Sequence, residues 1–306
     1  WGNGATGIAG VVSTANSLYG SQDGDFVGSS GVTALSNGNY VVASSQWKNQ
    51  TEAFAGAVTW ANGATGITGP VSTENSLYGT QSQDFVGGGG VTALTNGNYV
   101  VASYNWANGS ELSAGAVTWG NGATGITGAV TAENSLVGSQ DGDIVGRDVT
   151  ALSNGHYVAV SPYWSSETAA EVGAVTWGNG EEGSIGTVSA ANSLVGTQAN
   201  DHVGGYGVTA LANGNYVVAS PSWDNGGDAN VGAVTWGDGT TGTVGAVGPG
   251  NSLYGSQPGD RVGRGGVTAL TDGNYVVTSS LWDNEALADV GAVTWGSGAV
   301  FTAVAV

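Results

Sequence analysis

Several residue types are rare or missing in this chain of 306 residues. It contains no cysteine, which excludes disulfides and thiolate metal sites. Only 4 side chains are Lys or Arg, against 23 that are Asp or Glu, and the formal net charge is −19. Because such a charge repels phosphate backbones and anionic lipid surfaces, and because no apolar run is long enough to span a bilayer, we expect no nucleic acid partner and no membrane insertion.

What the chain has in abundance is one repeated hairpin sequence. GVTALSNGNYVVASSQW, residues 31–47, consists of two apolar, β-rich strands on either side of Asn37-Gly38. Asn-Gly is the pair that best tolerates the positive φ angles of a type I′ turn, so the sequence predicts a β-hairpin with that turn. Nearly the same run returns at residues 90–106, 148–164, 207–223 and 266–282.

Tryptophan gives the period of this repetition. One series recurs every 59 residues, or 58 in one case, and consists of Trp1, Trp60, Trp119, Trp177, Trp236 and Trp295. The second series precedes it by 13 residues and consists of Trp47, Trp106, Trp164, Trp223 and Trp282. Periods of this length indicate propellers or solenoids. We expect the first series to lie in the core between neighbouring repeats.

The strand pattern within a repeat favours a propeller blade. The second repeat is expected to form four antiparallel strands, at 91–94, 98–104, 114–119 and near 126–132. The first two are apolar on both faces, as in a small sheet between two others. The predicted fold is therefore all-β, a five-bladed β-propeller closed by pairing of the N- and C-terminal strands. A β-solenoid, which needs a shorter repeat and parallel pairing, is the alternative.

No composition shift marks a linker, so a single domain is predicted over residues 1–306. It consists of five tandem repeats, at about 1–59, 60–118, 119–176, 177–235 and 236–294, followed by a C-terminal strand at 295–306. Two segments, 4–13 and 299–306, compete to fill the one open blade edge. The segment left over would allow self-association through terminal strands.

One motif resembles a known group of repeats. The run GDxVGxxGVTALxNGNYVV, here Gly24 through Val42 and again within 259–284, is similar to tandem repeats of large secreted bacterial proteins described as haemagglutinin-like or adhesin-like. The resemblance covers all five repeats. It implies a location outside the cell or at its surface and an adhesive role.

Catalytic residues are hard to find. The only histidines, His156 and His202, each occur in a single repeat, without a recognisable nucleophile or metal-ligand partner. We therefore predict that the chain is not an enzyme. The alternative is a hydrolase on a propeller scaffold, in which Glu181-Glu182, or Glu167 with Glu171, act as paired carboxylates.

One aspartate recurs in every repeat, directly before a variable residue and Val-Gly. The series is Asp25, Asp84, Asp143, Asp201 and Asp260. Such an aspartate is expected to accept hydrogen bonds from backbone N–H groups of a turn. Two copies carry a second acid, Asp23 before Asp25 and Asp141 before Asp143, which suggests Ca²⁺ as the alternative. No cofactor is predicted otherwise.

Sequence variation collects at one end of the predicted sheets. The loops KNQTEAF, ANGSELS, SSETAAE, DNGGDAN and DNEALAD follow the second tryptophan series and differ in every repeat. The connectors that begin NSL vary too, and carry Arg147, Tyr206 and Arg264. Because recognition residues lie on loops of a rigid scaffold, this end is the predicted binding face. Trp47, Trp106, Trp164, Trp223 and Trp282 stand at its base, either stacked on a sugar ring or buried under the loop.

These features together predict an extracellular, non-enzymatic binding or adhesion module. Its expected partner is a glycan or a cell-surface protein. The alternative is a structural repeat body of a surface fibre or filament.

Overall fold

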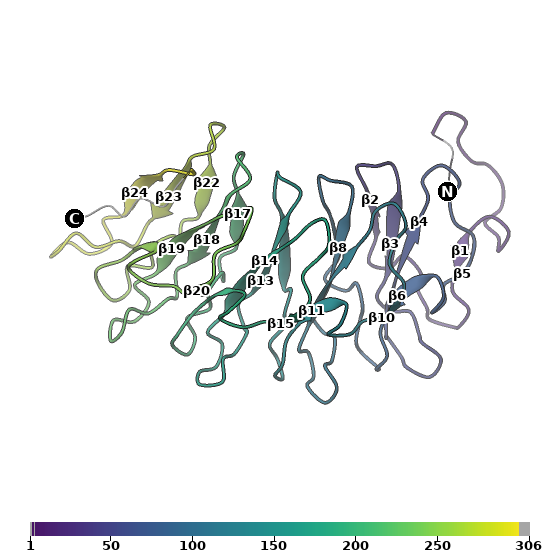
Figure 1. The fold of residues 1–306 in the computed structure, drawn as a ribbon, viewed down its shortest axis with the longest axis horizontal. Helices are drawn as coiled ribbons and strands as arrows, with labels where there is room; N and C mark the ends of the chain where they lie inside the picture. Colours follow the sequence, from purple (N-terminus) through teal and green to yellow (C-terminus); the bar gives the residue numbers. More distant parts are fainter. Residues whose placement is uncertain (1, 3, 300–306) are drawn as a thin grey trace. The chain divides into compact units, whose positions relative to one another are not determined.

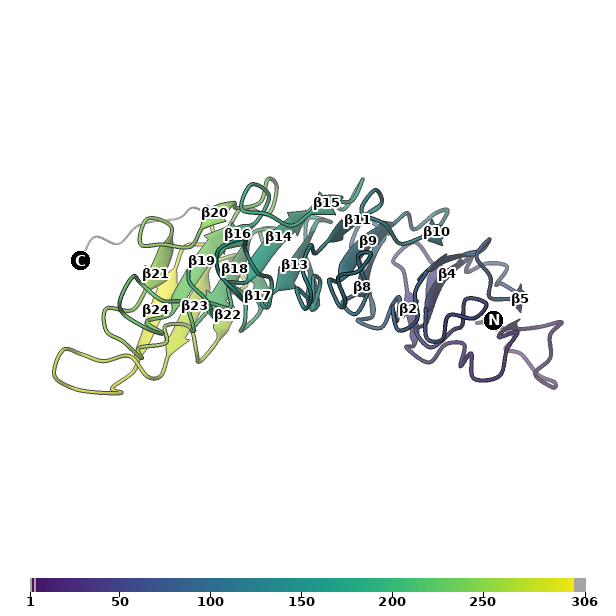
Figure 2. The same cartoon turned by 90° about the horizontal axis from the view of Figure 1, so that it is seen from below.

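A computed structural model describes residue 2 and residues 4–299. These residues form 24 β-strands and no helix, so the predicted all-β class is confirmed. Consequently none of the described residues belongs to a helix that could cross a membrane. Figures 1 and 2 show the strands gathered into short sheets that recur along the chain.

Each repeat contains an antiparallel set of three strands, as the hairpin sequence predicts. The first strands are β2 (Val32–Ala34), β7 (Val91–Ala93), β12 (Asp148–Ala151), β17 (Val208–Ala210) and β22 (Val267–Ala269). The second strands are β3 (Tyr40–Ser44), β8 (Tyr99–Ser103), β13 (Tyr157–Ser161), β18 (Tyr216–Ser220) and β23 (Tyr275–Ser279). The third strands are β4 (Ala57–Ala61), β9 (Ala116–Gly120), β14 (Ala174–Gly178), β19 (Ala233–Gly237) and β24 (Ala292–Gly296).

The hairpin turn differs in type from the prediction. The amide of Leu35 donates to the carbonyl of Asn39 at 2.8 Å and the amide of Gly38 donates to Leu35 at 3.0 Å, which encloses three turn residues. Only Gly38, with φ of 86°, lies in the left-handed region. A type I′ turn needs positive φ at two residues, so this is a three-residue turn with a single left-handed glycine.

The fourth strand lies later in the chain than predicted. The stretch 126–132 contains only β10 (Gly128–Ala129), and it pairs in parallel with the preceding repeat. The strand that pairs antiparallel with the third strand comes from the segment expected to be a connector. These fourth strands are β6 (Ser76–Tyr78), β11 (Ser135–Val137), β16 (Leu194–Val195) and β21 (Ser252–Tyr254). The counterpart of these strands at the start of the chain is β1 (Leu18–Tyr19), which pairs with no third strand among the described residues. The short parallel strands are β5 (Gly69–Pro70), β10, β15 (Gly186–Thr187) and β20 (Gly245–Ala246).

The predicted closed five-bladed propeller is wrong, because no sheet of the described residues closes. β1 pairs only with β5, and β24 pairs only with β23. The four short strands join each fourth strand to the following repeat, as in the pairing of β10 with β6. Parallel pairing between repeats is the feature expected of a β-solenoid, the alternative to the propeller. Residues 4–13 form no strand, and of the tail at 299–306 only Ala299 lies within the described residues.

The chain divides into two compact units. One contains residues 1–141 with 180–187, and the other contains residues 142–179 with 188–306. Within each unit, the internal sheets are buried on both faces, as the apolar pattern predicts, whereas Val32 of β2 and Val293 of β24 are exposed. In the first unit, Val41 and Val58 pack in one cluster with Tyr99 and Val101 of the next repeat. In the second unit, Val158 and Val175 pack with Tyr216 of the next repeat.

Four members of the first tryptophan series join neighbouring repeats within the units, as expected, and are partly buried there: Trp60, Trp119, Trp177 and Trp236. Trp295 is 60% exposed instead, and Trp1 lies outside the described residues. The indole Nε1 of Trp60 donates to the carbonyl oxygen of Gly122 at 2.9 Å, and Trp236 donates to Gly298 at 3.0 Å. The asparagine of the hairpin turn reaches a glycine of the same type, since Asn37 Nδ2 donates to the Gly122 carbonyl at 2.8 Å. The Asn-Gly turns and the turns that follow the third strands therefore lie together, and we call this the turn end of the repeat.

Candidate binding face

The variable loops and the connectors also lie together, as the sequence predicts. We call the five variable loops (residues 48–54, 107–113, 165–171, 224–230 and 283–289) the Trp loops. With the connectors (residues 16–31, 75–90, 134–147, 192–207 and 251–266) they form the loop end. In the first unit, Asn49 Nδ2 donates to the carbonyl of Gly79 at 3.0 Å, and the Lys48 amide donates to Asp25 Oδ1 at 3.2 Å.

The recurring aspartates organise this end from inside. Asp84 is fully buried, and its Oδ2 accepts hydrogen bonds from the amides of Thr80 and Gln81, both at 2.9 Å. Its Oδ1 accepts one from Ala107 at 3.1 Å, so one carboxylate ties a connector to the Trp loop of its own repeat. Desolvation raises the pKa of Asp84, against the opposing effect of these hydrogen bonds. Asp201 repeats the arrangement, and its pKa is raised for the same reason.

This geometry agrees with the expectation that the recurring aspartates accept hydrogen bonds from backbone amides of a turn. Asp25 and Asp143 are likewise buried, at 2% and 0% exposure, whereas their candidate partners Asp23 and Asp141 lie on the surface. Asp141 Oδ1 accepts the amide of Leu112 at 2.6 Å. Within residues 2 and 4–299, no three His, Asp or Glu side chains gather in a way that could hold a metal ion.

The second tryptophan series lies beneath the Trp loops. Trp47, Trp106, Trp164 and Trp223 are only 3–6% exposed, and Trp282 is half-buried. The indole nitrogens of the four buried members have no hydrogen-bond acceptor among the described residues. Ring stacking on a sugar would require the Trp loops to move aside, so in this conformation the rings support the loops.

A groove of about 220 Å³ opens beside Trp47 in the first unit. Its walls include Gln22 of the connector, Lys48 and Asn49 of the Trp loop, and Val71. Lys48 Nζ donates to the carbonyl of Asp23. The groove therefore combines an apolar wall with amide and ammonium groups, a mixture that suits a small hydroxyl-bearing ligand.

The three predicted connector residues are all exposed. Arg264 and Arg147 lie on the surface, and Tyr206 is 53% exposed. The guanidinium of Arg147 lies over the ring of Tyr163, 5.4 Å from its centroid. This contact fixes the cation against an aromatic face while leaving it open to solvent.

The structure adds a series of positions that the sequence did not single out. The residue after each recurring aspartate has a left-handed backbone although it carries a large side chain. The series is Phe26, Phe85, Ile144, His202 and Arg261, with φ of 41–49°. A left-handed backbone costs a non-glycine residue about 1–2 kcal/mol. The chain accepts this cost in all five repeats, and the side chain is different in nearly every one.

A second series of residues with a left-handed backbone lies at the C-terminal end of the Trp loops. Phe54, Ser113, Glu171, Asn230 and Asp289 have φ of 50–58°. Members of the two series meet where one repeat follows another. Phe54 stacks on Phe85 with ring centroids 5.5 Å apart, and Glu171 Oε2 lies 3.6 Å from His202 Nε2. The amide of Arg261 donates to the carbonyl of Asn230 at 3.1 Å. We call these contacts the left-handed pairs.

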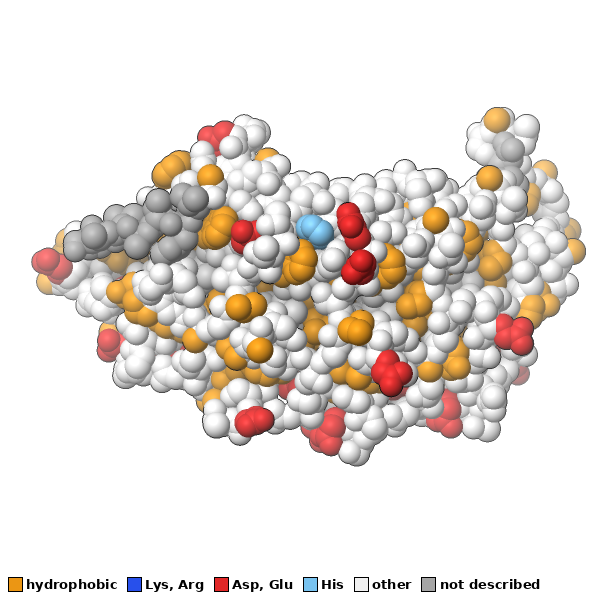
Figure 3. Space-filling model, viewed as in Figure 1, with side chains coloured by type: hydrophobic (Ala, Val, Ile, Leu, Met, Phe, Trp, Pro, Cys, Tyr) orange, Lys and Arg blue, Asp and Glu red, His pale blue; other side chains and the backbone are white. Residues whose placement is uncertain are grey.

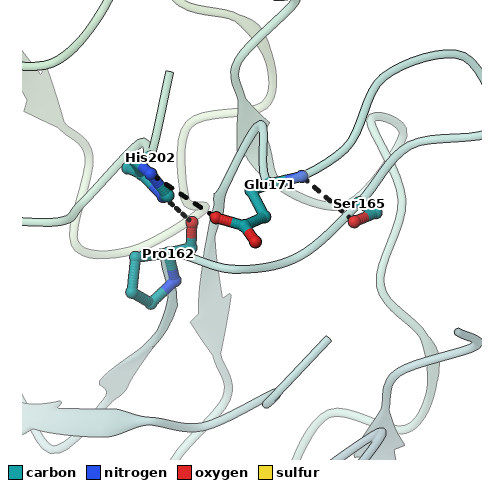
Figure 4. A network of polar contacts seen from close by, with 4 residues as sticks. All are labelled: Pro162, Ser165, Glu171 and His202. Carbon is teal, nitrogen blue, oxygen red and sulfur yellow. Dashed lines mark hydrogen bonds and ion pairs between the residues drawn. The ribbon is translucent and has the colours of Figure 1, made fainter. Parts of the chain in front are cut away.

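The pair of Glu171 and His202 belongs to a local network (Figure 4). His202 Nδ1 lies 3.1 Å from the carbonyl oxygen of Pro162, and the amide of Glu171 donates to Ser165 Oγ at 3.0 Å. The ring of Tyr163 meets the imidazole edge-on at 5.6 Å. No partner for His202 could be recognised in the sequence, because Glu171 lies 31 positions earlier, in the preceding Trp loop. In this network the imidazole nitrogens face a carbonyl and a carboxylate.

Charge on the surface follows the composition. The face in Figure 3 shows acidic side chains, some of them adjacent, among uncharged ones, with no Lys or Arg in view. The Glu181-Glu182 pair follows the third strand of its repeat in the sequence, whereas Glu167 and Glu171 belong to the Trp loop before that strand.

A family model described as a repeat of unknown function (DUF5650) matches the chain six times. The matched residues are 1–29, 34–88, 93–147, 151–205, 210–264 and 269–306. The matches confirm tandem repetition. They number six where five repeats were predicted, and the first and the last match are shorter than the other four. No curated protein matches the chain.

Proposed function

The chain belongs to the family of repeats of unknown function (DUF5650), whose description names no activity, and we propose from its geometry that it is a non-enzymatic binding or adhesion module acting outside the cell. The loop end is the proposed binding face. The similarity of its motif to repeats of secreted adhesin-like proteins supports the extracellular location.

The left-handed pairs are the observation that carries this proposal. Strained backbone conformations are concentrated at functional sites. Here the strain recurs at two positions of each repeat, both at the loop end, and the side chains there change from aromatic to ionic. A framework that fixes the backbone while the side chain varies suits recognition of several related ligands.

A glycan is the proposed ligand class. Hydroxyl-rich ligands tolerate a face in which acids outnumber bases, whereas phosphate-rich ligands do not. The exposed aromatic and planar cationic groups, Phe26, Tyr206 and Arg147, supply surfaces on which sugar rings and their hydroxyls bind. The buried tryptophans act beneath these contacts by holding the Trp loops in place.

A structural role as the body of a surface fibre is the second candidate. Repetition of one unit and parallel strand pairing between repeats favour it. A hydrolase on this scaffold is the third, for which the Glu171–His202 contact is the only specific support.

A glycan array probed with the labelled chain separates these functions. If the chain is a binding module, it should be retained by a limited set of the glycans on the array. The test variant carries DNGGDAN in all five Trp loops, a graft of equal length that should leave the chain folded. The matched control is Ser36→Ala at the turn end.

Loss of glycan retention in the grafted chain but not in the Ser36→Ala control would support the loop end as the site. Equal retention by all three chains would move the site elsewhere. No retention of any glycan or host surface protein by the native chain would leave the fibre body as the better account.

A further inference from the structure

Each complete repeat joins its third and fourth strands in the same register. Ala57, Val58 and Thr59 pair antiparallel with Tyr78, Leu77 and Ser76. The hydroxyls of Thr59 and Ser76 lie 2.7 Å apart inside the sheet, and the same contact recurs between Thr235 and Ser252. The register of β19 with β21 is identical, with Val234 opposite Leu253.

The valine of the third strand also packs directly over the Cα of one glycine. A Cβ at Gly87 would lie 2.5 Å from Cγ2 of Val58, and a Cβ at Gly263 would lie 2.5 Å from Cγ2 of Val234. Both valines are 1% exposed. The glycine therefore forms a socket that the valine fills, and only a residue without Cβ fits there.

The last described third strand, β24, has an unused edge. Among the described strands it pairs only with β23. Its valine, Val293, is 74% exposed, and Trp295 is 60% exposed. The sequence Ala292-Val293-Thr294 is the same as at the internal positions 57–59 and 233–235.

The counterpart of the fourth strands at the start of the chain, β1, has the complementary unused edge. Ser17-Leu18-Tyr19 repeats the sequence at 76–78 and 252–254, and among the described strands β1 pairs only with β5. A Cβ at Gly28, the counterpart of Gly87, would meet only Cγ1 of Val42, at 3.9 Å. The socket over Gly28 is therefore open.

The backbone amides beside this socket follow the same pattern. In an internal repeat, the amide of Phe85 donates to the carbonyl of Phe54, and the amide of Val86 donates to Ala55, at 2.9 and 3.0 Å. Phe26 and Val27 are the counterparts of these donors. Their amides have no acceptor among the described residues.

We propose that copies of this chain associate through these two edges. Ala292, Val293 and Thr294 of one copy pair with Tyr19, Leu18 and Ser17 of a second copy, and Val293 fills the socket over Gly28. The contact continues an interface that the internal repeats already use, which is why a second copy is the occupant. Since the two edges differ, each copy that joins leaves one edge open, and association continues beyond a dimer into a ring or a filament.

Charge affects this assembly only indirectly. Neither pairing segment contains a charged residue, whereas each copy carries a formal net charge of −19. Salt screens repulsion between exposed charges, so the association should strengthen as ionic strength rises.

Sedimentation velocity over a concentration series tests the proposal with the chain 1–306. The weight-average mass should rise with concentration and with added salt. Val293→Glu should weaken association more than about 100-fold, because the contact would bury an unpaired carboxylate. The matched control, Val244→Glu, adds the same charge at a valine that is 54% exposed and outside both edges. A constant monomer mass up to about 1 mM, or equal weakening by both substitutions, would overturn the proposal.

Cysteine pairing tests the register, since the native chain has no cysteine. A mixture of Ser17→Cys and Thr294→Cys chains should form a disulfide-linked dimer on mild oxidation. A mixture of Ser36→Cys and Thr294→Cys chains should not. A double variant that forms a linked monomer at all concentrations would show that the two edges meet within one chain, and would overturn association between copies.

Discussion

Two neighbouring residues on each connector behave in opposite ways. Asp201 is the same in every repeat, is fully buried and satisfies three backbone amides. His202, directly after it, differs between repeats, is partly exposed and has a left-handed backbone. The aspartate holds the connector for every repeat alike, whereas the next position presents whatever side chain the repeat carries. The connector thus places a residue that holds the fold directly before one whose side chain varies between repeats.

The largest expected loss of stability follows from removal of the buried aspartate side chain. Asp201→Ala should lower the free energy of unfolding by about 2–4 kcal/mol, because three amides that the carboxylate satisfies lose their acceptor. Urea unfolding followed by tryptophan fluorescence measures the change. Asp23→Ala, at an exposed position of the first connector, is the control and should change stability by less than about 0.5 kcal/mol. Equal effects of the two substitutions would contradict the assigned role.

A smaller loss is expected where the framework is packed most tightly. A Cβ at Gly237 would overlap the ring of Tyr216, whose pKa burial raises to about 12. Gly237→Ala should therefore cost about 1–3 kcal/mol through overpacking. Ala61 stands naturally at the same position of the first repeat, where Tyr40 is less buried.

The converse substitution, Ala61→Gly, is the control for Gly237→Ala. It should change the unfolding free energy only by the modest cost of a glycine in a strand. If Gly237→Ala leaves the thermal midpoint unchanged, the tyrosine has room that the structure does not show.

The buried aspartates also predict how stability depends on pH. Desolvation raises the pKa of Asp84 and Asp201 above 3.8, so the folded state binds these protons more tightly than the unfolded state. The free energy of unfolding should therefore rise as pH falls from 7 through the folded-state pKa toward about 4. The pKa of Asp238 is lowered by its hydrogen bond with Thr240, and its contribution is lost only below that range.

Urea unfolding at a series of pH values checks this sign. The rise between pH 7 and about 4 should shrink in Asp201→Asn, which removes one of the two titrating groups. A native chain that loses stability steadily over the same range would show that the hydrogen bonds to these carboxylates outweigh their desolvation.

The hairpins, the all-β class and the two ends of the repeat follow from local sequence. Val41, Val42 and the Asn-Gly turns specify strands and a turn whatever lies beside them. The absence of ring closure and the position of the fourth strand could not be predicted from local sequence. Both depend on which strands of neighbouring repeats pair with each other. Gly128–Ala129 carries no pattern that distinguishes a parallel partner in the preceding repeat from an antiparallel partner in its own.

The candidate site was predictable in its location but not in its key residues. Loop variation indicated the loop end, and Arg147, Tyr206 and Arg264 are exposed there. The left-handed pairs were missed because Phe85 or His202 looks in sequence like any variable residue. Their φ angles and the contacts with Phe54 and Glu171 exist only once the connector reaches the preceding Trp loop.

The most direct test of this account is the unfolding free energy of a chain with asparagine at Phe26, Phe85, Ile144, His202 and Arg261. Asparagine tolerates the left-handed backbone, so if these side chains are kept for recognition, the variant should be as stable as the native chain within about 0.5 kcal/mol per position, or more stable. A loss of more than about 1 kcal/mol per position would show that the side chains serve packing, and would contradict the separation between the buried aspartate and its exposed neighbour.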